Sequence, residues 1–177
     1  MGDRFGLLGQ GRWILNSNTD GDQPTRKGIP KMYVADIMTE NPVTIRLDGT
    51  LREALEKMDM VGCHHLPVLS IDGHLVGVLS ERDCRRTHHS PTEMHERNQE
   101  DELALNLPVR RIMTPAPIII EPHAPAEEAA RLMLVNHIGC LPVMRAETLI
   151  GIVTRSDILM AFMNLQRIAN GTPKTNQ

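Results

Sequence analysis

A hydroxyl side chain followed three residues later by a carboxylate occurs twice in the chain, each time after a glycine and two aliphatic residues. The first copy is Gly77-Val-Leu-Ser80-Glu-Arg-Asp83, and the second is Gly151-Ile-Val-Thr154-Arg-Ser-Asp157. A carboxylate accepts two hydrogen bonds, which suits the cis-diol of a ribose. A hydroxyl at a strand end and helix start can face the same ligand, and backbone N–H groups there favour phosphate. The two hydroxyls and two carboxylates are therefore candidate contacts to ribose and phosphate.

The same spacing also has a purely structural interpretation. Ser-x-x-Asp or Thr-x-x-Asp before an apolar run is a capping box, in which the two side chains satisfy backbone donors at the start of a helix. Both roles can coexist, because a capping hydroxyl keeps a lone pair for a second partner. The spacing alone leaves both interpretations open.

Each motif lies within a longer repeat. Val34 to Thr39 matches Val109 to Thr114, and Leu66-Pro-Val68 matches Leu141-Pro-Val143, all at an offset of 75 residues. The offset falls to 74 at the motif glycines, so one residue is missing from a loop in the second copy. Two copies are too few for a solenoid. They favour two units that pack on one another.

Each copy is predicted to have the order β-α-β-β-α. Thr50-Leu-Arg-Glu53 is a capping box that begins a helix ending at Gly62. Asp72-Gly73 predicts a hairpin between two strands. The further expected elements are strands at 42–47, 65–71, 74–79, 140–144 and 149–153 and helices from Ser80, at 90–105, 125–133 and 157–165. We expect an α/β (α+β) fold in which two half-exposed sheets bury one another with pseudo-two-fold symmetry.

The composition restricts the class of protein. Hydrophobic residues make up 41% and aromatic residues 2% of 177 residues, so the core must be aliphatic and rich in methionine. The net charge of −3 and the lack of a basic run give no footprint for nucleic acid. No apolar run is long enough for a membrane span, and no secretory signal opens the chain. Three cysteines without CxxC spacing fit a reducing cytoplasm.

Histidines and cysteines give little support for metal binding or catalysis. His64-His65 and His88-His89 are adjacent pairs, and neighbouring side chains on a strand point to opposite faces. Cys63 beside them lacks a third, orienting residue for a nucleophile. We therefore expect no metal site and no enzyme activity. Cys63 and Cys140 are predicted to be buried as small hydrophobic residues.

With these repeats, the chain resembles a tandem pair of cystathionine-β-synthase (CBS) domains, also called a Bateman module. The resemblance rests on Met38-Thr39-Glu-Asn-Pro42 and Met113-Thr114-Pro-Ala-Pro117, on both Leu-Pro-Val triplets and on both Gly-to-Asp motifs. It covers about residues 33–167, with no catalytic domain attached. It implies a stand-alone regulatory module that binds an adenosyl ligand such as AMP, ADP, ATP or S-adenosylmethionine between the two units. Many such pairs are homodimers that control a partner protein.

The resemblance also implies which basic residues meet phosphate. Residues just before Leu-Pro-Val touch phosphate in some relatives, which makes His64 and His65 candidates, whereas the second copy has Gly139-Cys140 there. The two clefts should therefore differ, and the first is better suited to a charged nucleotide. Arg82, Arg155 and Thr50 complete the candidate ligand contacts. The alternative for each arginine is a solvated position at a helix start, and the alternative for Thr50 is its capping role.

The sequence thus predicts a flexible arm (1–31), CBS domain 1 (32–89), a helical linker (90–107), CBS domain 2 (108–168) and a tail (169–177). The predicted function is that of an adenosyl-ligand sensor, with no obligatory cofactor, that signals to an unknown partner by reorienting its units or protomers. The alternative is a dimerisation or docking module that keeps the fold and binds no ligand.

Overall fold

The computed structural model describes residues 7–8, 12–13, 31–88 and 102–169. The chain divides into one unit at 1–30 and another at 31–177. In the first unit, β1 (Leu7–Leu8) pairs antiparallel with β2 (Arg12–Trp13). We expected no element in this arm, and that prediction was wrong here because two-residue strands are too short to show a periodic pattern. The rest of the arm, residues 89–101 of the linker and the tail after 169 lie outside the described residues.

A four-stranded sheet of the second unit has the order β4-β5-β6-β7. Its strands are β4 (Ile45–Arg46), β5 (His65–Leu69), β6 (Leu75–Ser80) and β7 (Thr114–Pro115). β4 runs parallel to β5, and the other pairs are antiparallel. Helix α1 (Leu51–Val61) begins at the predicted Thr50–Glu53 capping box and ends at Gly62, whose φ of 69° is left-handed. It buries Leu51, Ala54 and Met58 in the core of this sheet.

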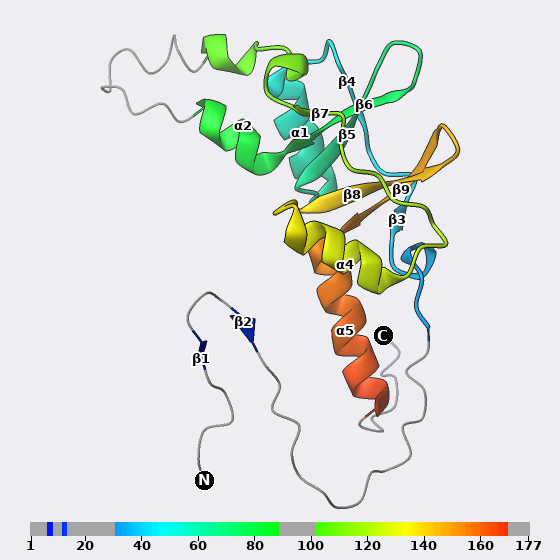
Figure 1. Cartoon of the computed structure of the whole chain (residues 1–177). Coiled ribbons are helices and arrows are strands. Elements are labelled where there is room, and N and C mark those ends of the chain that lie inside the picture. Colours follow the sequence, from blue (N-terminus) through cyan, green and yellow to red (C-terminus); the bar gives the residue numbers. More distant parts are fainter. Residues whose placement is uncertain (1–6, 9–11, 14–30, 89–101, 170–177) are drawn as a thin grey trace, which may run out of the picture. The chain divides into compact units, whose positions relative to one another are not determined.

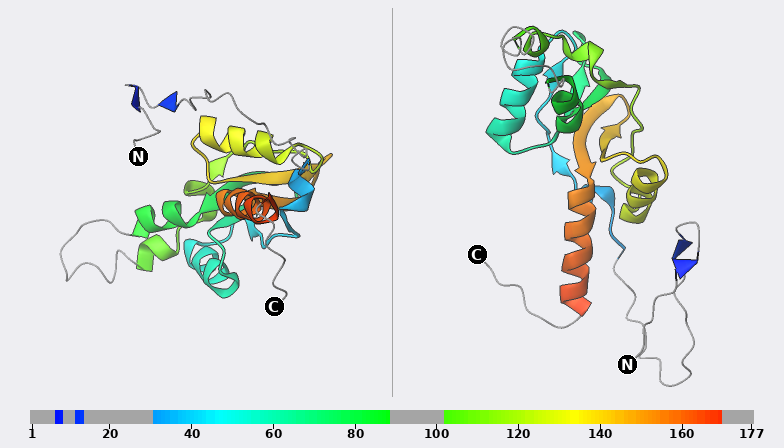
Figure 2. Two further views of the ribbon diagram at one scale, coloured as in Figure 1. Left: turned by 90° about the horizontal axis from the view of Figure 1, so that it is seen from below. Right: turned by 90° about the vertical axis from the view of Figure 1, so that its left-hand side faces the viewer.

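The second sheet has three strands in the order β3-β9-β8. They are β3 (Thr39–Glu40), β9 (Thr148–Thr154) and β8 (Cys140–Arg145), all antiparallel. Helix α2 (Glu81–His88) follows β6, α4 (Ala126–Val135) precedes β8, and α5 (Arg155–Ala169) follows β9. Figure 1 and the right-hand view of Figure 2 show α5 extending away from both sheets. Residues 102–105 are also helical, at the end of the predicted linker helix.

The opening segment of each repeat packs into the core of the other repeat. Val34 is buried with α4, β8 and β9, while Val109 is buried with α1, β5 and β6. The backbone bonds repeat this exchange: Val34 N–H donates to the Ala124 carbonyl at 2.9 Å, and Val109 N–H donates to the Gly49 carbonyl at 2.8 Å. β3 accordingly pairs with β9, and β7 pairs with β6. The two repeats therefore complete one another.

A smaller cluster joins the two sheets directly. Val78 of β6, Cys140 of β8 and Ile152 of β9 are buried against one another. This contact confirms that the sheets bury one another, as the repeat predicted. The single-residue offset also lies in a loop, because the first hairpin has three residues between Ser70 and His74, whereas the second has two between Arg145 and Thr148.

The predicted first strand of the second repeat is reduced to one residue. Ile120 forms an isolated parallel bridge with Val143. In the first repeat, Leu47 N–H extends the ladder by donating to the Leu69 carbonyl at 2.9 Å. The matching residue is Pro122, which has no N–H, so the ladder cannot continue. The prediction of β-α-β-β-α was therefore wrong for this strand of the second copy.

Two glycines permit the exchange of opening segments. A Cβ atom at Gly77 would lie 2.6 Å from the Met113 sulfur and 2.9 Å from the Thr114 carbonyl oxygen. At Gly151 it would lie 2.6 Å from the Met38 sulfur and 3.1 Å from the Thr39 carbonyl oxygen. A methionine side chain can adjust, but a strand carbonyl opposite the glycine cannot move without disturbing the ladder.

Gly77→Ala and Gly151→Ala should therefore each lower the free energy of unfolding by about 1–3 kcal/mol, as overpacking does elsewhere. Urea unfolding followed by circular dichroism measures this change. Ala116→Gly is the matched control: Ala116 is exposed and has a φ of 46°, so glycine should leave stability unchanged or slightly raised. Glycine variants as stable as the parent chain would contradict the proposed packing.

Candidate functional site

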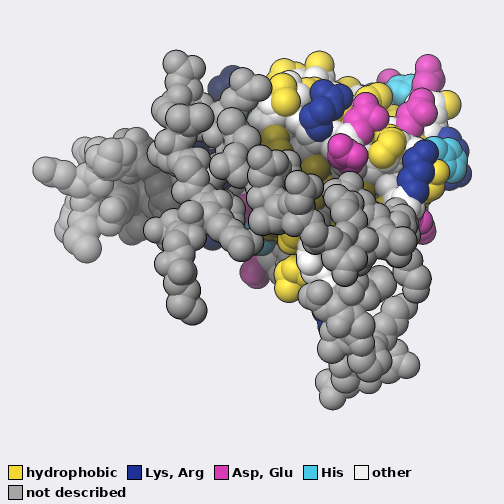
Figure 3. All heavy atoms as spheres, turned by 60° about the horizontal axis from the view of Figure 1, so that its bottom comes forward, with side chains coloured by type: hydrophobic (Ala, Val, Ile, Leu, Met, Phe, Trp, Pro, Cys, Tyr) yellow, Lys and Arg dark blue, Asp and Glu magenta, His cyan; other side chains and the backbone are white. Residues whose placement is uncertain are grey.

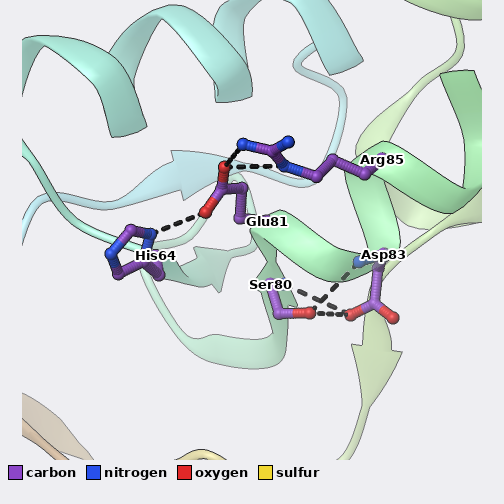
Figure 4. Close-up of polar contacts among 5 residues, drawn as sticks. All are labelled: His64, Ser80, Glu81, Asp83 and Arg85. Carbon is purple, nitrogen blue, oxygen red and sulfur yellow. Dashed lines mark hydrogen bonds and ion pairs between the residues drawn. The ribbon is translucent and has the colours of Figure 1, made fainter. Parts of the chain in front are cut away.

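Each repeated motif spans the end of a strand and the start of a helix. Asp83 Oδ2 accepts hydrogen bonds from the Ser80 hydroxyl at 2.5 Å and the Ser80 N–H at 3.3 Å, and Asp83 N–H donates to Ser80 Oγ at 3.2 Å. Thr154 and Asp157 repeat the pattern at 2.7, 2.7 and 3.4 Å. Figure 4 shows the Ser80–Asp83 pair at the start of α2. The capping interpretation of both motifs is therefore correct.

The caps leave each aspartate with an unused acceptor. The hydrogen bonds that the two carboxylates accept all go to Oδ2, and in the described part of the chain Oδ1 of Asp83 and of Asp157 accepts none. Both aspartates are half-buried. An ionised carboxylate has about four lone-pair sites, so each aspartate can cap its helix and still accept hydrogen bonds from two ligand hydroxyls.

The adjacent histidines point to different surroundings. His64 Nδ1 lies 2.6 Å from Glu81 Oε2, and its side chain is 72% exposed. Arg85 also pairs with Glu81, and these hydrogen bonds, that of Arg85 first, lower the pKa of the Glu81 carboxyl. Figure 4 shows this cluster separate from Ser80 and Asp83. Glu81 was not predicted as a site residue from the sequence. Its position at the start of a predicted helix, directly after a strand, was the signal that could have found it.

His65 instead lies at the boundary between the repeats. Its Nε2 is 2.7 Å from where a Cβ atom of Gly139 would stand. Burial lowers the pKa of the imidazole, as do the positive groups of His64, Arg155 and Arg82, while Asp83 acts in the opposite direction. Arg82 and Asp83 stand at the start of α2, and Arg155 stands at the start of α5. His65 is thus the candidate that the fold brings between the two motifs.

The two arginines are held differently. Arg155 Nε donates to the Ile138 carbonyl at 3.0 Å, which fixes this side chain beside β8. Its backbone N–H donates to the Gly139 carbonyl at 3.1 Å, and Glu81 N–H makes the equivalent bond to His64 at 2.9 Å. Arg82 is exposed and forms no hydrogen bond or ion pair within the described ranges. It has donors free for an anion.

Thr50 is a cap at the start of α1. Its hydroxyl accepts from Glu53 N–H at 3.2 Å, and its backbone bridges to Pro108. The described contacts join it to neither motif, so its role as a ligand contact stays a prediction.

A hollow of about 520 Å³ lies at the other end of the strands. Residues of both repeats line it: Asn41, Pro42, Thr44, Leu69, Asp72, Gly73, His74, Glu147, Thr148 and Leu149. It contains two carboxylates and no lysine or arginine, so its charge is unfavourable for phosphate. None of the candidate ligand residues belongs to it. We therefore place the candidate site at the motifs and not at this hollow.

All three cysteines are free thiols. Burial raises the pKa of Cys84 to about 11 and that of Cys140 to about 12, and it also raises the pKa of the half-buried Cys63. These thiols stay protonated at neutral pH, which makes them poor nucleophiles. Within the described ranges, no group of three His, Cys, Asp or Glu residues is arranged to hold a metal ion.

Comparison with known proteins identifies the family to which the chain belongs. The CBS domain matches residues 34–89 and 109–164, which together are more than half of the chain. The chain belongs to the CBS-domain family. A CBS domain-containing protein of Dictyostelium discoideum is 41% identical over 131 residues, which are 73% of this chain and 90% of that protein.

Solved CBS pairs share the fold. CBSX2 of Arabidopsis thaliana, in complex with AMP, has a TM-score of 0.61 at 29% identity and covers 76% of this chain and 98% of its own. The CBS domain pair of protein MJ0100, in complex with 5′-methylthioadenosine and S-adenosyl-L-methionine, has a TM-score of 0.64 at 25% identity, with coverage of 76% and 98%. The predicted tandem CBS pair and its mixed α/β fold are confirmed.

The surface of the CBS pair gives two further observations. The visible part of the face in Figure 3 mixes basic, acidic and apolar side chains without a continuous basic patch. No helix in the described ranges combines the length and apolar character needed to cross a bilayer.

The two helix caps lead to a prediction about stability that does not depend on any ligand. Ser80→Ala and Thr154→Ala should each lower the free energy of unfolding by about 1 kcal/mol, because the aspartate N–H loses its acceptor. Ser156→Ala is the matched control, since this exposed hydroxyl forms no hydrogen bond in the described part of the chain. If chemical denaturation gave the same loss for Ser156→Ala as for Thr154→Ala, the capping role would be refuted.

Proposed function

We propose that this CBS pair is a regulatory module that binds an adenosyl ligand of the AMP, ADP, ATP or S-adenosylmethionine class. The observation that carries the proposal is the unused Oδ1 of Asp83 and of Asp157, each beside a hydroxyl and the N-terminus of a helix. Asp83 and Asp157 would accept from the ribose diol, with Ser80 and Thr154 beside them. The AMP complex of CBSX2 and the S-adenosyl-L-methionine complex of MJ0100 support this ligand class.

The phosphate contacts follow from the arrangement of positive charge. Arg82 offers free donors from α2, Arg155 is held at the start of α5, and His65 lies between them. Guanidinium groups bind phosphate oxygens through several fixed donors. His64 is a weaker candidate, because its ring is already paired with Glu81. Two unequal clefts are therefore proposed.

The signal would be a change in the orientation of the two repeats or of two protomers. A ligand bound between the repeats would contact residues of both, and each repeat is already joined to the other through its opening segment. It shifts their equilibrium only as far as it binds one arrangement more tightly. We propose that an unidentified partner protein in the cytoplasm reads this change, in a role of regulation and not of catalysis.

A homodimer is the proposed form of the module. Large apolar side chains are exposed on three helices, with Met60 and Val61 on α1, Leu134 and Val135 on α4, and Leu159, Met160, Phe162 and Met163 on α5. Exposed apolar side chains that gather on a surface typically mark a protein–protein interface. Light scattering should give twice the mass of the chain, and Phe162→Glu should shift it toward the mass of one chain. A monomer at every tested concentration would contradict this form.

The alternative function is a docking module without a ligand. It is favoured by the caps, which satisfy both motifs without any ligand, and by the position of the 520 Å³ hollow away from them. The two functions differ in whether the aspartates contribute to binding.

Asp83→Asn with Asp157→Asn separates them. The amides preserve side-chain size, but the loss of the charged acceptors should weaken AMP binding about tenfold or more, as measured by isothermal titration calorimetry. Asp72→Asn, in the hairpin that lines the hollow, is the matched control and should bind as the parent chain does. Unchanged affinity in the double variant would show that the site is elsewhere. If AMP bound neither the parent chain nor the double variant, the result would favour the docking module.

A further inference from the structure

We infer that His65 determines the specificity of the proposed ligand site, favouring adenosyl ligands that carry a phosphate over uncharged ones, more strongly at lower pH. The inference rests on the proposed function and adds to it a regulatory input. Its basis is the position of one imidazole between the two repeats.

The position of His65 makes the two repeats unequal. Gly139 is the second-repeat match of His64, and it has no side chain. The imidazole of His65 fills this space from the first repeat, with Nε2 at 2.7 Å and Cε1 at 3.1 Å from where a Cβ atom of Gly139 would stand. Any side chain at 139 would displace the ring. The boundary therefore contains one histidine from one repeat, and its match in the second repeat, Cys140, is a buried neutral thiol.

Charges from several elements act on this ring. His65 pairs with Ser80 in the sheet ladder, next to the start of α2. The charges of Arg82 and Asp83 on α2, of Arg155 on α5 and of the preceding His64 all act on it. On β8, the burial that raises the pKa of Cys140 to about 12 keeps that thiol uncharged. Of the groups whose charges act on His65, Asp83 is negative and the others are positive or become so. The carboxylate of Glu81, also on α2, is paired with His64 and Arg85. The positive groups that act on His65 attract an anion. When no anion is bound, they oppose the protonation of His65.

An anionic ligand would reverse this balance. The pKa of His65 lies below its usual value in the free protein, chiefly through burial. A phosphate beside the ring stabilises the imidazolium and raises that pKa, so binding takes up a proton. The added affinity is complete below the free-state pKa and is lost as pH rises through the ligand-bound pKa. Each unit by which the ligand raises the pKa adds about tenfold in affinity at low pH.

Adenosine and AMP separate this effect from the rest of the site. Both present the ribose to Asp83 or Asp157, and only AMP brings a phosphate. The phosphate itself gains a proton near pH 6, which weakens AMP binding as pH falls. His65→Gln removes the imidazole and leaves that second effect in place. The variant therefore serves as the reference for the parent chain.

The test is calorimetric titration of the full chain and of His65→Gln with AMP and with adenosine, at about pH 8 and about pH 5.5. For each protein, the preference for AMP is the Kd of adenosine divided by the Kd of AMP. Between the higher and the lower pH, we expect this ratio to rise about tenfold more in the parent chain than in His65→Gln. Adenosine brings no phosphate, so the ratio of its affinities for the two proteins should be the same at both pH values. An equal pH dependence of the preference in the two proteins would overturn the inference.

A second measurement needs no variant. The NMR titration of the His65 ring, with and without saturating AMP, should show a higher pKa in the complex, whereas adenosine should leave it nearly unchanged. An unaltered His65 titration in the AMP complex would refute the inference even if His65→Gln failed to fold. Binding of both compounds without this proton linkage would leave the proposed function standing. If neither compound bound at either pH, both proposals would fail.

Discussion

The packing of each opening segment on the sheet of the other repeat is the constraint on which the rest of the structure depends. The sulfur of Met113 lies over Gly77 and the sulfur of Met38 lies over Gly151, each beside a strand carbonyl. Neither repeat completes its own core, since Val34 and Val109 are exchanged. The two repeats therefore form one body. The ends of β6 and β9, with their motifs, are positioned by contacts that both repeats supply.

This exchange gives the candidate site its chemical character. Ser80–Asp83 and Thr154–Asp157 are near copies, and each is a satisfied cap with one carboxylate oxygen to spare. The symmetry ends at the residues just before Leu-Pro-Val. There the first repeat supplies two histidines, one paired at the surface with Glu81 and the other against Gly139. An internal duplication thus supplies matched candidate ribose contacts. The charged and titratable side chains differ at four matched positions, where His64, His65, Glu81 and Arg82 stand opposite Gly139, Cys140, Arg155 and Ser156.

Local features of the fold were predictable from the sequence, because they depend on neighbouring residues. The Thr50–Glu53 cap, the left-handed Gly62 and the one-residue difference between hairpins are of this kind. The exchange of opening segments was not predictable, since an offset of 75 residues is the same whether a segment serves its own repeat or the other. The shortened strand at Ile120 was foreseeable from Pro122, had the missing N–H been considered. The strand rule separated His64 from His65, but it could not tell which of them faces the boundary.

The most direct test of the account is thermal unfolding of the full chain with AMP, ADP, ATP, S-adenosylmethionine and a guanine nucleotide as the control. A ligand at 100 times its Kd stabilises the native state by about 2.7 kcal/mol, which raises the midpoint by about 5 °C or more at this size. The account predicts such a shift with at least one adenosyl compound and none with the guanine control. An unchanged midpoint with every adenosyl compound would contradict it and would leave the ligand-free docking module.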